Sequence, residues 1–166
     1  MPIPEFITDL REKIGNDLLW LPGVTVLVMR EGANPDVPEL LVVRRADSGA
    51  YTPITGIPDP AEHAHEAAIR EAKEEACIDI AIDGVLRVQA IPPVTYSNGH
   101  QCCYMDTAFL AHPVDPTQQP RVGDDESTYA AYVPVNQLPE MKPRFSALIE
   151  QALDNPHGPC QWSSPA

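Results

Sequence analysis

Basic residues are scarce in this sequence. Its 166 residues include 11 lysines and arginines against 24 aspartates and glutamates, so the formal net charge is −13. Binding of a nucleic acid polymer needs a basic stripe that neutralises phosphates, and no such stripe is visible. An acidic protein that handles anionic phosphates would need metal ions as mediators. The composition therefore argues against DNA or RNA as a partner.

Cysteines and long hydrophobic runs are lacking as well. Four cysteines are too few for a disulfide scaffold, and none lies in an array with zinc spacing. The longest apolar run, residues 18–29, is interrupted by Pro22 and Gly23 and is too short to cross a bilayer. The first residues have neither the basic region nor the apolar stretch of a secretory signal. We therefore expect a protein of the reducing cytoplasm with no membrane partner.

Hydrophobic residues, at 43% of the chain, suffice for one packed core at this length. The 19 prolines, more than twice average usage, indicate many ordered loops and short elements. No internal repeat or second domain is visible. We expect one domain over residues 1–154 and a loose C-terminal tail over residues 155–166.

Hydrophobic periodicity and turn residues predict the order of the elements. Helices are expected at residues 4–14, 62–76 and 144–153, and strands at 24–30, 39–45, 78–82, 85–91, 101–110 and 129–135. The Pro22-Gly23 pair predicts an irregularity before the first strand, residues 46–61 a loop, and Asn98-Gly99 a hairpin turn. Hairpins with only a few interposed helices predict an α/β fold, in which a mixed sheet lies between helices.

The predicted helix 62–76 carries an unusual set of acids. On a helix, Glu71 and Glu75 lie about 40° apart and ~6 Å along the axis, with Glu74 on the neighbouring edge. Glu66 and Glu74 have Arg70 one turn away, whereas Glu71 and Glu75 have no cation at helical spacing. An alanine stripe seats this helix on a sheet, so the acids project from a fixed platform. Such carboxylates suit a hard cation such as Mg²⁺, and a solvated acidic face is the alternative.

Residues 56–78 follow the pattern G-x5-E-x7-R-E-U-x-E-E-x-(G)-U, where U is apolar. This pattern resembles the signature box of the Nudix hydrolases, which cleave nucleoside diphosphates linked to another moiety X. Its matching positions are Gly56, Glu62, the Arg70-Glu71 pair and the Glu74-Glu75 pair. The order of the predicted elements is also similar to the α/β/α sandwich of that family.

The sequence departs from the family pattern in three places. Cys77 and Ala61 stand where glycines are common, and Ile54-Thr55 replaces the Pro-Gly that usually precedes the opening glycine. A helix often ends in a left-handed residue, for which glycine is favoured. A non-glycine residue that keeps this conformation costs about 1 kcal/mol. None of the departures removes a carboxylate.

The resemblance implies a role for each matching residue. Metal ions, Mg²⁺ or Mn²⁺, would be bound by Glu71, Glu74, Glu75 and the backbone carbonyl of Thr55. Arg70 would orient the glutamates in catalysis, and Gly56 and Glu62 would support the loop. Members of the family often carry a further glutamate outside the box as general base or metal ligand, and Glu126 is the candidate here. An ordinary acidic turn is the alternative for Glu126.

Three residues before the box are candidates for substrate binding. Arg44 and Arg45 end a predicted strand, where alternating side chains let one of them reach a phosphate. Tyr51 is a candidate for stacking on a base or ribose. An exposed arginine pair and a packed aromatic are the structural alternatives.

The predicted activity is Mg²⁺-dependent hydrolysis of a diphosphate bond in a nucleoside diphosphate derivative, such as ADP-ribose or a nucleotide sugar. Oxidised nucleoside triphosphates and dinucleotides are alternative substrates. A non-catalytic Nudix-fold binding module and a plain acidic interaction domain are alternatives of another class. The partner would be a small nucleotide, and the sequence leaves monomer or homodimer open.

Overall fold

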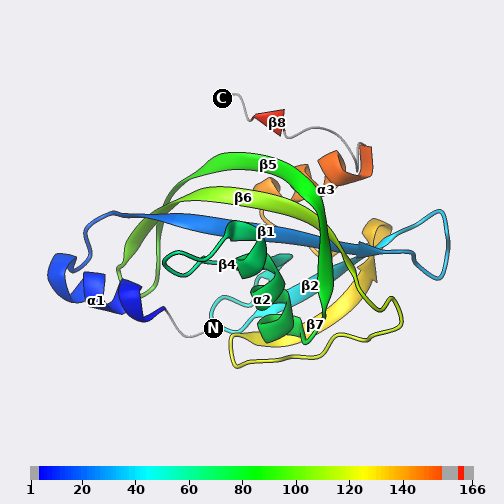
Figure 1. The fold of residues 1–166 in the computed structure, drawn as a ribbon, viewed down its shortest axis with the longest axis horizontal. Coiled ribbons are helices and arrows are strands. Elements are labelled where there is room, and N and C mark those ends of the chain that lie inside the picture. The colour runs from blue at the N-terminus through cyan, green and yellow to red at the C-terminus, as the bar shows by residue number, and fades with distance from the viewer. Residues whose placement is uncertain (1–3, 155–160, 163–166) are drawn as a thin grey trace.

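The computed structural model describes residues 4–154 and 161–162. A mixed sheet lies between helix α2 (Ala64–Ala76) and helix α3 (Pro143–Asp154), and helix α1 (Glu5–Ile14) lies at one end (Figure 1). The strands are β1 (Leu19–Arg30), β2 (Glu39–Arg45), β3 (Tyr51–Thr52), β4 (Ile54–Gly56), β5 (Ile80–Thr95), β6 (Gln101–Pro113), β7 (Ser127–Pro134) and β8 (Gln161–Trp162), with a short 3₁₀ helix η1 (Val135–Gln137) after β7. The predicted α/β fold with a sheet between helices is confirmed.

Strand β1 joins the two parts of the sheet. Along most of its length it runs parallel to β6, which pairs antiparallel with β5, and β5 pairs in turn with β8. On its other side β1 pairs antiparallel with β4, so that Val24 lies opposite Gly56. Its last two residues pair with β2, which continues to β3 and β7. This topology brings β4, the start of the predicted box, to the middle of the sheet.

The two faces of β1 bury different residues because side chains alternate along a strand. Val24, Val26 and Val28 belong to the apolar cluster beneath α2, whereas Leu27 belongs to the cluster beneath α3. Helix α2 contacts its cluster through alanines, among them the fully buried residues 67, 68, 72 and 76. Small side chains let the helix lie close to the sheet, which also brings its neighbouring glutamates close.

Several predicted boundaries are wrong. Pro22-Gly23 continues β1 without interruption, because β4 pairs only with residues 24–26 and leaves Pro22 at an unpaired edge. The strands predicted at 78–82 and 85–91 form one strand, β5, whose register shifts near Gly84 and Val94 absorb the turn-like residues. The predicted loop 46–61 contains β3 and β4, which are too short to show an alternating pattern.

The predicted division into a domain and a loose tail stays a prediction. Of residues 155–166, the structure describes 161–162, which pair with Arg87 and Val88 of β5. The other tail residues lie outside the described part of the chain. None of the helices described is long and apolar enough to span a membrane.

Candidate active site

Helix α2 keeps the backbone of the box despite its substitutions. The helix ends at Cys77, whose φ of 56° and ψ of 32° are left-handed and whose N–H donates to the Lys73 carbonyl at 3.1 Å. Ala61, in the loop before the helix, also has a positive φ of 69°. Both departures therefore retain the conformation that favours glycine, each at a cost of about 1 kcal/mol. The chain therefore adopts the left-handed conformation at both positions without glycine.

The carboxylates of Glu71 and Glu75 are buried between α2 and the sheet. The two residues are 1% and 4% exposed, so the expectation that they project from the helix surface is wrong. The close seating of the alanines on the sheet explains the difference. A Cβ atom at Gly56 would overlap the carboxylate of Glu71. Only glycine at this point of β4 lets Glu71 lie directly against the backbone.

Burial makes both acids difficult to ionise. It raises the pKa of Glu71 to about 7, against the opposing effect of Arg70. It raises the pKa of Glu75 to about 8, and the negative charge of Glu71 adds to this increase. One oxygen of Glu75, Oε2, is buried without a hydrogen-bond partner. The two carboxylates have too little positive charge near them to balance their own. Their oxygen atoms are therefore suitable ligands for a divalent cation.

Arg70 bridges the loop and the helix. Its Nε and Nη2 atoms donate to the two carboxylate oxygens of Glu62, each at 2.8 Å. Its Nη1 atom donates to Glu71 at 3.0 Å and to Glu74 at 3.3 Å. The inference that Glu71 has no cation within reach is therefore wrong, because the guanidinium of the adjacent residue folds back toward it. The hydrogen bonds from Arg70 lower the pKa of Glu62.

The structure does not assemble all the predicted ligands at one point. Glu71 lies within electrostatic range of both Glu74 and Glu75, and Arg70 donates to Glu71 and to Glu74, whose side chain is 41% exposed. Among the described residues, no three His, Cys, Asp or Glu side chains are close enough together to hold a metal ion. Thr55 lies in β4, next to Gly56 and opposite Thr25. The joint ligand set of Glu71, Glu74, Glu75 and Thr55 stays a prediction.

A second group of charged residues lies within electrostatic range of Glu75. Asp124 and Glu126 both contribute to its raised pKa, while Arg45 opposes the increase. Arg45 itself donates to both oxygens of Asp47, at 3.0 and 2.9 Å, and these bonds lower the pKa of Asp47 to about 2. The predicted residue Glu126 thus lies within electrostatic range of Glu75.

Sequence reasoning overlooked Asp47 and Asp124. The only sequence feature that could have identified them is their spacing from residues already predicted. Asp47 follows Arg45 by two residues, and Asp124 precedes Glu126 by two.

The candidates for substrate binding separate onto opposite faces of β2. Arg44 lies 5.7 Å from the ring centre of Tyr51, and Tyr51 meets Tyr129 edge to face at 5.9 Å. Arg45 points the other way, toward Asp47 and Glu75. The predicted group is thus split, because consecutive side chains alternate along a strand. Tyr129, which sequence reasoning missed, completes the row by pairing with Arg44 across β2 and β7.

Comparison with known proteins defines the class. The family model of the NUDIX domain matches residues 20–165, which is well over half of the chain. The chain belongs to the Nudix family, and its predicted enzyme class, a Nudix pyrophosphohydrolase, is confirmed. None of the curated proteins compared with the chain matches it.

Solved structures support the fold. An Ap4A hydrolase binary complex from C. elegans has a TM-score of 0.63 at 20% identity, with 81% of this chain and 96% of that chain covered. A UDP-X diphosphatase has a TM-score of 0.66 at 14% identity, with 96% and 74% covered. An ADP-ribose pyrophosphatase from Streptococcus suis has a TM-score of 0.61 at 16% identity, with 86% and 98% covered. At these identities the likeness shows the shared fold.

Proposed function

We propose that this chain hydrolyses a diphosphate bond in a nucleoside diphosphate derivative such as ADP-ribose or a nucleotide sugar, with Mg²⁺ or Mn²⁺ as the cation. The observation that carries the proposal is the buried pair Glu71 and Glu75, with the unpartnered Oε2 oxygen of Glu75. Two adjacent buried acids with raised pKa values lower the stability of the folded protein when no cation is bound beside them. A bound divalent cation would offset that cost.

The proposed roles follow from the contacts of each residue. Glu71, Glu75, Glu74 and the Thr55 carbonyl would hold the cation, which would neutralise the diphosphate oxygens and make water more acidic. Water attacks one phosphorus atom, the bond to the bridging oxygen breaks, and the carboxylate of Glu126 accepts the proton of the water. Arg70 keeps Glu71 and Glu74 in place through the hydrogen bonds described above.

The opposite face of β2 is the proposed contact for the remainder of the substrate. Arg44 donates to the Gly49 carbonyl at 3.1 Å, and no described residue forms a salt bridge with it. A guanidinium beside Tyr51 and Tyr129 suits a phosphate joined to a ring. The prediction that Arg45 contacts substrate also stands, although Asp47 holds its guanidinium.

A substrate screen tests the activity. Purified protein is incubated with ADP-ribose, UDP-sugars, dinucleoside polyphosphates and 8-oxo-dGTP, with Mg²⁺ or with EDTA, and the products are separated by chromatography. We expect Mg²⁺-dependent release of a nucleoside monophosphate from ADP-ribose or a UDP-sugar. Turnover restricted to triphosphates or dinucleotides would select the alternative substrates. Binding of ADP-ribose without turnover of any compound would favour a non-catalytic nucleotide-binding module.

A further inference from the structure

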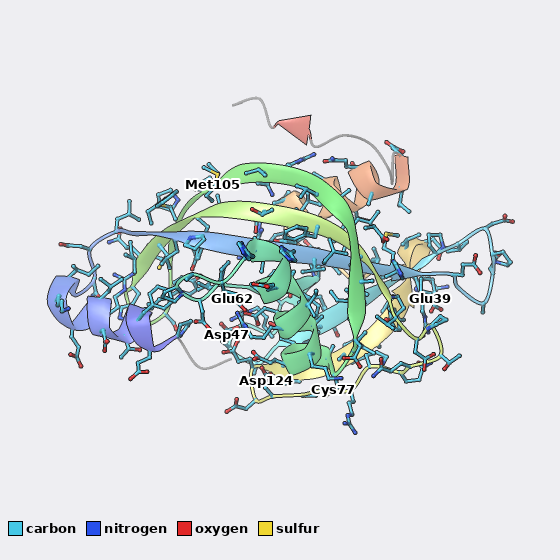
Figure 2. The ribbon with its side chains drawn as sticks, in the orientation of Figure 1. Glu39, Asp47, Glu62, Cys77, Met105 and Asp124 are labelled. Atoms are coloured by element: carbon cyan, nitrogen blue, oxygen red, sulfur yellow. The ribbon has the colours of Figure 1, made fainter. Side chains whose placement is uncertain are left out.

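The loop that carries Glu126 is attached to the end of α2. The N–H of Gly123 donates to the Glu75 carbonyl at 3.1 Å, and the N–H of Arg121 donates to the Ala76 carbonyl at 3.0 Å. The side chain of Gln118 donates to the Cys77 carbonyl, also at 3.0 Å. The last carbonyls of a helix have no partner within the helix, so this loop supplies what the helix lacks. Figure 2 shows Cys77 and Asp124 at this end of α2.

At Gly123 the backbone of the loop lies directly against the helix. A Cβ atom there would coincide with the carbonyl oxygen of Glu74 and would lie 3.1 Å from the sulfur of Cys77. The residue is not among the glycines with positive φ, so close packing, and not an unusual backbone conformation, excludes a larger side chain. Gly56 plays the same part at Glu71. Backbone therefore lies directly against α2 at two separate points.

The path from Gly123 to Glu126 is short and is fixed at both ends. The carbonyl of Glu126 accepts a hydrogen bond from the N–H of Ala46 at 2.6 Å, next to the end of β2. Its N–H donates to the Asp124 side chain at 3.1 Å. Only two residues separate Gly123 from Glu126, so they must absorb any displacement at Gly123. The position of the Glu126 carboxylate relative to Glu75 depends on this packing.

We propose that Gly123 is a positioning residue for hydrolysis, which acts by holding the 118–126 loop against α2 and so placing Glu126. This inference rests on the proposed function, in which Glu126 accepts the proton of the attacking water. A misplacement of about 1 Å at a reacting group can reduce turnover by about 100-fold. The proposed substrate contacts Arg44, Tyr51 and Tyr129 lie on β2, β3 and β7, outside the 118–126 loop, so we expect binding of substrate to change little.

The test compares Gly123→Ala with Gly84→Ala. A Cβ atom at Gly84 meets nothing within 4 Å, which makes that variant a matched control. With Mg²⁺ and the compound that the wild-type protein hydrolyses fastest, we expect Gly123→Ala to lower kcat by at least about tenfold, with KM within about twofold. Gln118→Ala removes the side-chain hydrogen bonds of Gln118 to the Cys77 carbonyl and from the Asp79 N–H, and adds no bulk. It should lower kcat in the same way and to a smaller extent. Gly84→Ala should retain both constants.

A double-mutant cycle shows whether Gly123 acts through Glu126. Gly123→Ala should add almost no further loss in a Glu126→Gln background, because residues that act as one unit are not additive. Additive losses would overturn the inference, as would an unchanged kcat in Gly123→Ala. If that variant fails to fold, the same cycle with Gln118→Ala decides between these outcomes.

Amide hydrogen exchange provides a readout that needs no substrate. Without metal, residues 118–126 should exchange faster in Gly123→Ala than in the wild-type protein. In Gly84→Ala they should exchange at the wild-type rate. Unchanged exchange in Gly123→Ala would contradict the packing part of the inference. Absence of turnover in the wild-type protein, with faster exchange in Gly123→Ala, would instead refute the proposed function and leave the loop attachment standing.

Discussion

At the scale of single residues, the box has other residues at two positions where the family commonly has glycine. The backbone at these positions still adopts the left-handed conformation that favours glycine. Cys77 and Ala61 both keep a positive φ, although each carries a side chain. The sequence could predict this cost, because the spacing of the box fixes which residue must close the helix. It could not predict that Arg70 folds back onto Glu71, because that contact depends on the position of Glu62 in the preceding loop.

Cys77→Gly should raise the free energy of unfolding by about 1 kcal/mol, since glycine removes the left-handed strain. Urea denaturation followed by circular dichroism measures the effect. Cys77→Ala is the control, because it removes the thiol and keeps the strained backbone. Equal unfolding midpoints for the two variants would show that the left-handed conformation of Cys77 carries no such cost.

The pKa values of Glu71 and Glu75 predict how the stability of the metal-free protein depends on pH. Both are raised from 4.5, to about 7 and about 8, so between pH 5 and 8 the folded chain binds more protons than the unfolded chain. Stability should therefore fall as pH rises through this range. Melting temperatures in EDTA measure it.

The Glu71→Gln/Glu75→Gln double variant separates these two acids from the general repulsion of an acidic protein. Its melting temperature should depend less steeply on pH than that of the wild-type protein. The same slope in both proteins would mean that neither acid has a raised pKa.

At the scale of elements, helices and hairpin turns were predictable from local patterns, whereas the full length of the strands was not. The alanine period locates α2 to within two residues, and Asn98-Gly99 forms the turn between β5 and β6, as expected. The single strand β5 was not predictable, because pairing with β6 continues past Gly84 and across Pro92-Pro93. The split between Arg44 and Arg45 follows from strand alternation once β2 is placed.

Gly56→Ala tests the contact between β4 and α2. The added methyl group would overlap the Glu71 carboxylate, and overpacking of this kind costs about 1–3 kcal/mol. Chemical denaturation should show a loss in this range, while Gly84→Ala, which enters open space, should lose much less. If both alanines cost the same, general loss of glycine from strands explains the effect, and the contact at Glu71 does not.

At the scale of the whole molecule, the enzyme class was predictable and the choice of substrate was not. Six residues at fixed spacing, from Gly56 to Glu75, identify the family without knowledge of the fold, because they lie in one continuous segment. The row of Arg44, Tyr51 and Tyr129 is assembled from three strands and has no pattern in the sequence. The charge of −13 argues against a polyanionic partner and carries no information on moiety X.

The central claim is that the buried carboxylates of α2 hold the cation for hydrolysis, and the Mg²⁺-dependent rate of Glu71→Gln tests it most directly. Glu66→Gln is the matched control, since Glu66 is exposed one turn earlier and accepts a hydrogen bond from the His63 N–H. We expect Glu71→Gln to lose at least about 100-fold in kcat, because a misplaced cation forfeits several kcal/mol of transition-state stabilisation. Its metal-free melting temperature should be equal or higher, and Glu66→Gln should keep nearly full activity. Full activity in Glu71→Gln, or equal losses in both variants, would contradict the account.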